Sequence, residues 1–398
     1  MKSAKMPKYF TLLCVCNPIL GQYVSPIPGI DLGTLLTLLF IWMMMIDKRR
    51  KVYKLPTTLS IVLSYTVLCT CIGLTGYLYS EPLNILTRFL RYIVLLVAMI
   101  GVGFPTYFDK ELYLKYLHKT TIIVAGYAML QSVVYFLTSI KLPNTFGPTK
   151  IVDDADVVVG TPSSVLEYFY RPPSLFYEPS HASYFMTPYL CYLLFSDPDL
   201  KDKRQRKLVA FVSLGILITT SGQGLAVLSV CWGIWFMRQM KKFNMKAIVL
   251  FLILITILII NFDLYRIVER VTTQDEFNAI DARSGGYDLI KTLSWKELIL
   301  GFGFGNYDTS IYYSSLAEII FCTGYVGLFF IFMMYFRAYK EGALFQKVLV
   351  IASAVLMAGG GIYNATSLCL YLPLLFSKDW DKFKFKISKP AEVKTFTK

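Results

Sequence analysis

Residues 171–181, RPPSLFYEPSH, form a polar, proline-rich run between two strongly apolar stretches. A second polar run, RSGG at residues 283–286, lies in another long loop. The chain around them is 55% hydrophobic and 17% charged over 398 residues, with a mean hydropathy of +0.53. A soluble core of this length could not bury so much apolar surface. The composition therefore indicates an all-α polytopic membrane protein, with residues 1–398 as a single integral membrane domain.

Apolar runs recur along the chain at lengths that suit tilted or kinked membrane helices. About twelve can be recognised, at residues 9–24, 31–46, 57–79, 83–104, 120–140, 182–196, 208–220, 224–238, 247–262, 313–336, 347–361 and 363–376. We therefore expect about twelve transmembrane helices. Two of the loops between them are long, at residues 141–181 and 263–312.

Lysine and arginine indicate the orientation, because cytoplasmic flanks retain positive charge during insertion. Most of the 40 basic residues fall in clusters that this arrangement places on one side. We therefore expect both termini in the cytoplasm and both long loops on the outer face. The net charge of +14 follows from this topology, and its short, scattered basic runs do not indicate nucleic acid binding.

Several other features exclude common classes of site. The eight cysteines lie in predicted spans, so no disulfide framework is expected. The D-x-D pattern in residues 153–156 has no neighbours that would complete a metal site, so we expect no metal. The run GFGFGN at residues 301–306 follows no strand, so it predicts a tight, aromatic-lined loop folding back onto the membrane surface rather than a nucleotide site.

Arginines that break the inside pattern are candidates for anion binding, because charges near a bilayer are costly. Arg88 and Arg91 lie one helical turn apart near the outer end of the fourth span and share a face. Such a pair suits a diphosphate at the headgroup level. The alternative is that they reach lipid phosphates or pair with Glu81. Arg266 and Arg270 in the second long loop are further candidates for binding substrate.

The run at residues 171–181 brings different polar groups to one helix start. Pro179 suits the first turn, which leaves Glu178 at the cap and His181 on that turn. The free amides there favour an anion, which Arg171 could join. Glu178 could accept a proton, and His181 could accept or donate one near neutral pH. The alternative is that Arg171 and Glu178 form a salt bridge that only orders the loop.

Two more positions complete the candidate set. Arg283 opens the second polar run, in the other long loop. Glu318 lies just inside the tenth span, where an acid usually pairs or acts, and we assign it to substrate binding. A hydrogen bond from Glu318 that packs two helices together is the alternative.

Short motifs follow one another in a characteristic order from the third span onward. They are EPSHA at 178–182, TTSGQG at 219–224, RSG at 283–285, GFGFGN at 301–306 and LAEI at 316–319. This order resembles that of the bacterial O-antigen polymerase and ligase superfamily. The resemblance implies a GT-C-like glycosyltransferase of the bacterial inner membrane that acts on its periplasmic side without nucleotide, metal or other cofactor.

The resemblance also implies the substrate and the partners. The substrate would be an undecaprenyl-diphosphate-linked oligosaccharide. The polymerase branch transfers a growing O-antigen or capsule chain onto the next repeat unit, and the ligase branch transfers a finished chain to the lipid A core of lipopolysaccharide. A flippase and a chain-length regulator are the protein partners that such a pathway implies. Both branches use arginines in the two large periplasmic loops, which correspond here to Arg171 and Arg283.

Two departures from the superfamily pattern bear on the branch. Ligases usually carry a His-Asn pair before the tenth span, where this chain has Tyr312 and Tyr313, which we assign to substrate binding. Many members carry a basic residue after the Ser of the TTSGQG turn, which is absent here. We therefore predict a Wzy-type polymerase. A flippase or transporter would also need about twelve spans, but its charges should line the midplane between repeated halves, and no internal repeat is visible.

Overall fold

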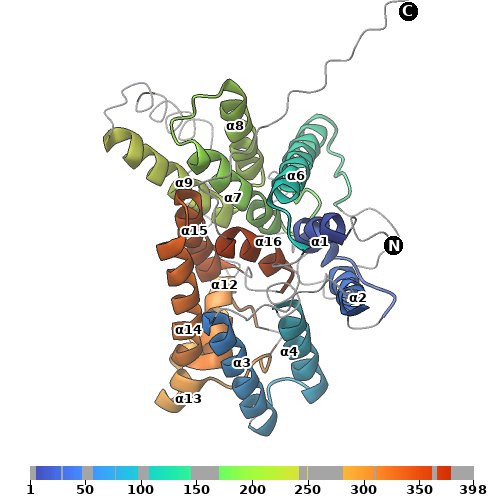
Figure 1. Ribbon diagram of the computed structural model, residues 1–398, viewed down its shortest axis with the longest axis vertical. Coiled ribbons are helices and arrows are strands. Elements are labelled where there is room, and N and C mark those ends of the chain that lie inside the picture. Colours follow the sequence, from blue (N-terminus) through green and yellow to red (C-terminus); the bar gives the residue numbers. More distant parts are fainter. Residues whose placement is uncertain are drawn as a thin grey trace, which may run out of the picture.

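The computed structural model describes residues 6–27, 30–46, 57–76, 78–96, 107–144, 170–241, 249, 281–308, 311–360 and 365–377. The described chain is helical, and the β pairing within it is an isolated antiparallel bridge between Val24 and Asp31. The helices are α1 (Met6–Leu20), α2 (Leu32–Ile46), α3 (Thr57–Thr75), α4 (Pro82–Leu96), α6 (Lys110–Thr138), α7 (Pro179–Ser196), α8 (Lys203–Ile218), α9 (Gly222–Lys241), α12 (Asp281–Lys291), α13 (Trp295–Leu300), α14 (Ser315–Glu341), α15 (Leu344–Gly359) and α16 (Ala365–Phe376) (Figure 1).

Two described helices, α6 and α14, are long and apolar enough to cross a membrane. Shorter apolar helices lie at Leu32–Met44, Ser64–Thr75, Leu344–Gly359 and Ser367–Phe376. Together with the apolar composition, these helices are those of a membrane protein. The predicted all-helical class is confirmed for the described residues. The count of about twelve crossings and the GT-C-like architecture stay predictions.

Most predicted spans coincide with described helices. Eleven of the twelve apolar runs overlap a named helix, and the ninth, residues 247–262, lies outside the described residues apart from residue 249. The fifth begins earlier than predicted, because α6 starts at Lys110, next to its N-cap residue Asp109. The Asp109 carboxylate accepts a hydrogen bond from the Leu112 amide at 3.0 Å, which stabilises the first turn. Lys110, Lys115 and Lys119, which form one of the basic clusters, therefore lie on this helix.

The short helix α16 lies at the centre of the described structure (Figure 1). It packs against α1, α4, α7 and α15, and its residues from Leu368 to Leu375 are almost completely buried. On one side of it, α7, α8 and α9 pack on one another, and α6 contacts α7 and α8. On the other side, α3 packs against α4 and α14, and α13 packs against α14. Segments from distant parts of the chain therefore meet around α16.

The helix α14 is broken at Gly324, which has φ 63° and ψ −174°. Such a break leaves the carbonyl groups just before it without partners one turn ahead. The segment after α13 supplies partners, because the amides of Phe302 and Gly303 donate to the carbonyls of Phe321 and Cys322, both at 2.9 Å. The break in one helix is thus the docking point of another segment.

The docked segment, residues 301–306, is called the glycine loop below. It is tight and rich in aromatic residues, as predicted, and it packs against α3 as well as α14. A Cβ on Gly73 of α3 would lie only 2.9 Å from the Cα of Gly303. The Tyr65 hydroxyl of α3 donates to the carbonyl of Thr323 at 2.9 Å, which satisfies a third group beside the break.

We expect Gly303→Ala to destabilise the protein. Gly303 has φ 106°, a conformation that costs an ordinary residue about 1–2 kcal/mol, and a Cβ there would clash with Gly73. The midpoint of thermal unfolding in detergent should fall. In Gly233→Ala, the control in α9, the new Cβ meets nothing within 4 Å, so the midpoint should stay or rise slightly. Equal midpoints for Gly303→Ala and the wild type would contradict this account of the contact.

Candidate functional site

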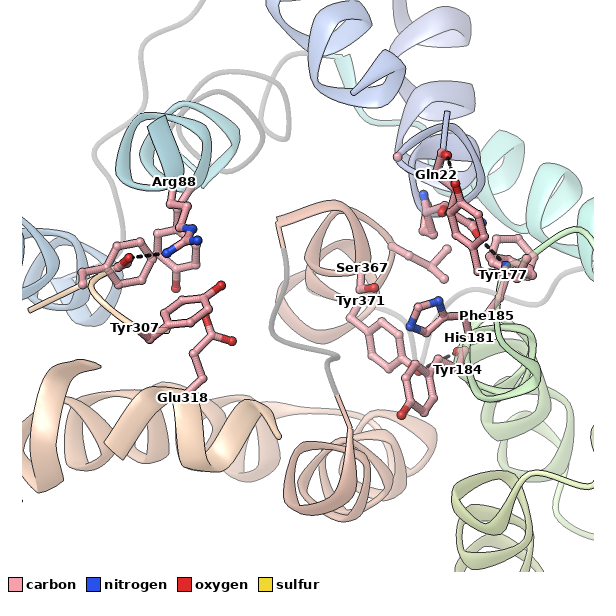
Figure 2. Close-up of a pocket in the computed structure, with 17 residues that line it drawn as sticks. Gln22, Arg88, Tyr177, His181, Tyr184, Phe185, Tyr307, Glu318, Ser367 and Tyr371 are labelled. Atoms are coloured by element: carbon pink, nitrogen blue, oxygen red, sulfur yellow. Dashed lines mark hydrogen bonds between the residues drawn. The ribbon is translucent and has the colours of Figure 1, made fainter. Parts of the chain in front are cut away.

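A cavity of about 360 Å³ lies where α1, α4, α7, α14 and α16 meet the glycine loop. Its volume is in the range of small-molecule binding sites. Two groups of side chains face each other across it (Figure 2). One group consists of Arg88, Tyr307 and Glu318, and the other of Gln22, Tyr177, His181, Tyr184, Ser367 and Tyr371. The first group carries both signs of charge, and the second is mainly aromatic.

The Arg88 guanidinium is held against the glycine loop. Its Nη1 donates to the carbonyl of Gly305 at 2.6 Å and to the hydroxyl of Ser80 at 3.1 Å. Its carbon Cζ lies 4.3 Å from the centroid of the Tyr307 ring, a distance typical of a cation–π contact. Within the described ranges, only Nη1 of this side chain donates hydrogen bonds, so Nε and Nη2 keep donors for a ligand.

Asn306 positions the wall that holds Arg88. It is fully buried, and its Oδ1 accepts hydrogen bonds from the amides of Tyr79 at 2.8 Å and Ser80 at 3.3 Å. Its Nδ2 donates to the carbonyl of Phe302 at 3.1 Å, and the Ser80 hydroxyl donates to the carbonyl of Tyr307 at 2.6 Å. Asn306 was not among the predicted site residues, although it ends the glycine repeat, which is the signal that could have identified it.

Glu318 lies in the first turn of α14 and is half-buried. It lines the main cavity and also a second one of about 20 Å³ between α3 and α14. No described residue forms a hydrogen bond or an ion pair with its carboxylate, although the positive charge of Arg88 acts on it through space. The predicted alternative, a hydrogen bond that packs two helices, is therefore not found among the described residues.

The loop before α7 is held by amide side chains from other elements. Ser174 is fully buried with φ 57°, and its amide donates to Oε1 of Gln131 at 2.7 Å. The Gln131 Nε2 donates back to the carbonyl of Ser174 at 3.2 Å. Nearer the cavity, Oε1 of Gln22 accepts from the amide of Tyr177 at 2.7 Å. These bonds satisfy backbone groups that would otherwise be buried without partners.

The three candidate residues of this loop are placed differently. His181 lies on the first turn of α7, as predicted, and lines the cavity with its ring centroid 5.8 Å from that of Tyr184. Glu178 is the N-cap residue, as predicted, but its Oε2 accepts from the Ser180 hydroxyl at 2.7 Å and it does not line the cavity. Arg171 is half-buried and also lies outside the cavity lining.

The two tyrosines that we assigned to substrate binding do not line the cavity. The Tyr312 hydroxyl donates to the carbonyl of Gly359 at 3.5 Å. Tyr313 is buried, with its ring centroid 5.4 Å from that of Tyr307 and 5.3 Å from that of Phe321. Tyr313 therefore supports Tyr307 from behind the cavity wall.

The remaining predicted residues are placed only by the backbone or lie outside the described residues. Arg91 lies on α4, one turn after Arg88, and Arg283 lies on α12. Arg266, Arg270 and the D-x-D run in residues 153–156 lie outside the described residues. In the described part of the chain, no cluster of His, Cys, Asp and Glu could hold a metal ion.

Comparison with known proteins places the chain among polysaccharide polymerases. The sequence model of one family, WcaD colanic acid polymerase, matches residues 13–275, which is 263 of the 398 residues. No curated protein and no solved structure matches the chain. The match includes Arg88 and His181, whereas the glycine loop and Glu318 lie beyond it. It confirms the prediction of a Wzy-type polymerase. The chain belongs to the WcaD colanic acid polymerase family.

Proposed function

We propose that this protein polymerises oligosaccharide repeat units carried on undecaprenyl diphosphate, at the periplasmic face of the bacterial inner membrane, in O-antigen or capsule synthesis. Membership of a polysaccharide polymerase family supports the reaction type. The observation that carries the substrate class is the cavity, which combines a fixed arginine with an aromatic wall. A diphosphate suits the arginine, and a sugar ring suits the flat faces of the aromatic side chains.

In this proposal Arg88 binds the diphosphate of one lipid-linked unit. Its guanidinium is fixed by Gly305 and Tyr307, so little side-chain freedom is lost when the ligand binds. Its Nε and Nη2 can then donate to phosphate oxygens. Arg91, one turn further along α4, and Arg266 and Arg270 in the second long loop are proposed to bind the same or the second lipid-linked unit.

Charge stabilisation supplies much of the catalysis. When the bond between the anomeric carbon and the diphosphate breaks, the carbon becomes positive and the diphosphate takes the electron pair. Positive charges that reach the diphosphate lower this barrier, and we assign that role to Arg88 in the cavity and to Arg171 and Arg283 from the two long loops. Binding both sugar units in one cavity aligns the attacking hydroxyl with the anomeric carbon. His181, which lines the cavity, is proposed to hydrogen-bond a sugar unit.

We expect Arg171→Ala and Arg283→Ala to abolish polymer formation, because each removes a charge that stabilises the departing diphosphate. Each variant would be purified and its yield compared with that of the wild type. It would then be reconstituted in liposomes with a lipid-linked repeat unit, and the products would be resolved by size. No nucleotide or metal would be added. Arg337→Ala, which alters an exposed ion pair with Glu341, is the control and should form the normal ladder.

Two results would count against the proposal. Full-length polymer from both Arg171→Ala and Arg283→Ala would remove these residues from the reaction. Unchanged monomer with the wild-type protein and its cognate substrate would reject polymerisation. In that case transfer to a lipid A core acceptor would test the ligase, and movement of the lipid-linked glycan across the bilayer would test the transporter.

The role of Arg88 in binding the diphosphate can be tested by a conservative substitution. Arg88→Lys keeps the positive charge, but a lysine ammonium lacks the planar guanidinium. It cannot hydrogen-bond Gly305 and Ser80 and at the same time donate two parallel hydrogen bonds to phosphate. The loss of a charge-assisted hydrogen bond costs about 1.5–3 kcal/mol, so the Kd for undecaprenyl diphosphate should rise about 10- to 100-fold. Binding would be measured with the radiolabelled lipid in detergent, with Arg337→Lys as the matched control. An unchanged Kd would show that Arg88 does not bind the diphosphate.

A further inference from the structure

Glu318 lies where a carboxylate is expected to have either a binding partner or a function. It lies in the first turn of α14, where its amide donates to the carbonyl of the N-cap residue Ser314 at 2.8 Å. The positive end of the helix dipole favours negative charge there. An acid within a membrane protein is nevertheless costly, and it usually has a partner or a function. Among the described residues Glu318 has neither a hydrogen-bond partner nor an ion-pair partner.

The nearest candidate partner is held by other groups. Arg88 and Glu318 come from α4 and α14 and lie on the same side of the cavity (Figure 2). The Arg88 guanidinium instead donates to Gly305 and Ser80 and stacks on Tyr307. Two opposite charges therefore face one cavity without forming an ion pair. This separation leaves a cation that can bind an anion and a carboxylate that can accept a proton.

The other two candidate bases are placed less well for a reaction at Arg88. Glu178 already accepts a hydrogen bond from Ser180 and does not line the cavity. His181 lines the cavity but lies across it, on the aromatic side (Figure 2). A base must reach the hydroxyl that attacks the anomeric carbon, and that carbon is bonded to the diphosphate. Glu318 shares the wall of the proposed diphosphate site.

We propose that Glu318 is the catalytic base of the transfer, which rests on the proposed function and adds an assignment to it. The acceptor O–H bond breaks and its proton moves to the Glu318 carboxylate. The freed oxygen forms a bond to the anomeric carbon of the donor sugar. The bond from that carbon to the diphosphate breaks, and the lipid diphosphate leaves with the electron pair. The proton then passes to the departing diphosphate or to water, which restores the carboxylate.

The test uses Glu318→Gln, a neutral side chain of nearly the same shape, in full-length protein reconstituted with a lipid-linked repeat unit. The kcat should fall about 10²- to 10⁴-fold, the usual contribution of a general base. The Kd for undecaprenyl diphosphate and the thermal unfolding midpoint should stay near wild-type values. Glu318→Asp keeps a carboxylate that is set back by one methylene, so its kcat should lie between those of the wild type and Glu318→Gln.

Glu297→Gln is the matched control. Glu297 is half-buried in α13 and does not line the cavity, and Gln can replace Glu in its capping box with Ser294, so kcat should be unchanged. If the wild type makes a ladder and Glu318→Gln makes it at the same rate, the base assignment is overturned while the polymerase stands. Parallel losses of lipid binding and rate would also overturn it, because they would show that Glu318 binds substrate. No ladder from the wild type would instead reject the proposed function itself.

Discussion

The break in α14 at Gly324 is the constraint on which the described site depends. It exposes the carbonyls of Phe321 and Cys322, and the amides of the glycine loop bind them. Buried backbone groups without partners would cost about 1–3 kcal/mol each, so the break and the loop stabilise each other. The docked loop then presents the Gly305 carbonyl to Arg88. A local irregularity in one helix thereby determines where a charge on another helix lies.

On the opposite side of the cavity, hydrogen bonds to backbone groups again hold a segment in place, but here side-chain amides make them. The loop before α7 has no regular hydrogen bonding of its own, and side-chain amides of Gln131 and Gln22 pair with its backbone. The buried helix α16 contributes Ser367 and Tyr371 to this wall. The backbone segments behind both walls are therefore fixed by side-chain amides, those of Asn306 on one side and of Gln131 and Gln22 on the other.

The sequence could predict features that depend on local pattern. Hydropathy located the helices, because apolar runs are the direct requirement of a membrane helix, and Pro179 located the helix start that carries His181. The cost of charge near a bilayer singled out Arg88 and Glu318, which the structure brings to one cavity. The single-domain organisation and the roles of the other arginines stay predictions.

The sequence could not predict features that depend on contacts between distant segments. The role of Asn306 follows from its bonds to residues 79 and 80, which no local pattern reveals. Tyr312 and Tyr313 were assigned by their position before the tenth span, but Tyr313 packs behind the wall against Phe321 and the Tyr312 hydroxyl donates to the carbonyl of Gly359. The start of α6 was predicted too late because hydropathy does not register a capping residue such as Asp109.

The contact between Gly73 and Gly303 limits how this protein can change over evolutionary time. A pair of packed side chains can drift, because one residue may shrink when its neighbour grows. Here both residues are already the smallest that exist, and a Cβ on Gly73 would lie 2.9 Å from the opposing Cα. No substitution at one position can compensate for a larger residue at the other. A lineage that abandoned the contact would have to move the backbone of α3 or of the glycine loop, and the wall beside Arg88 would move with it.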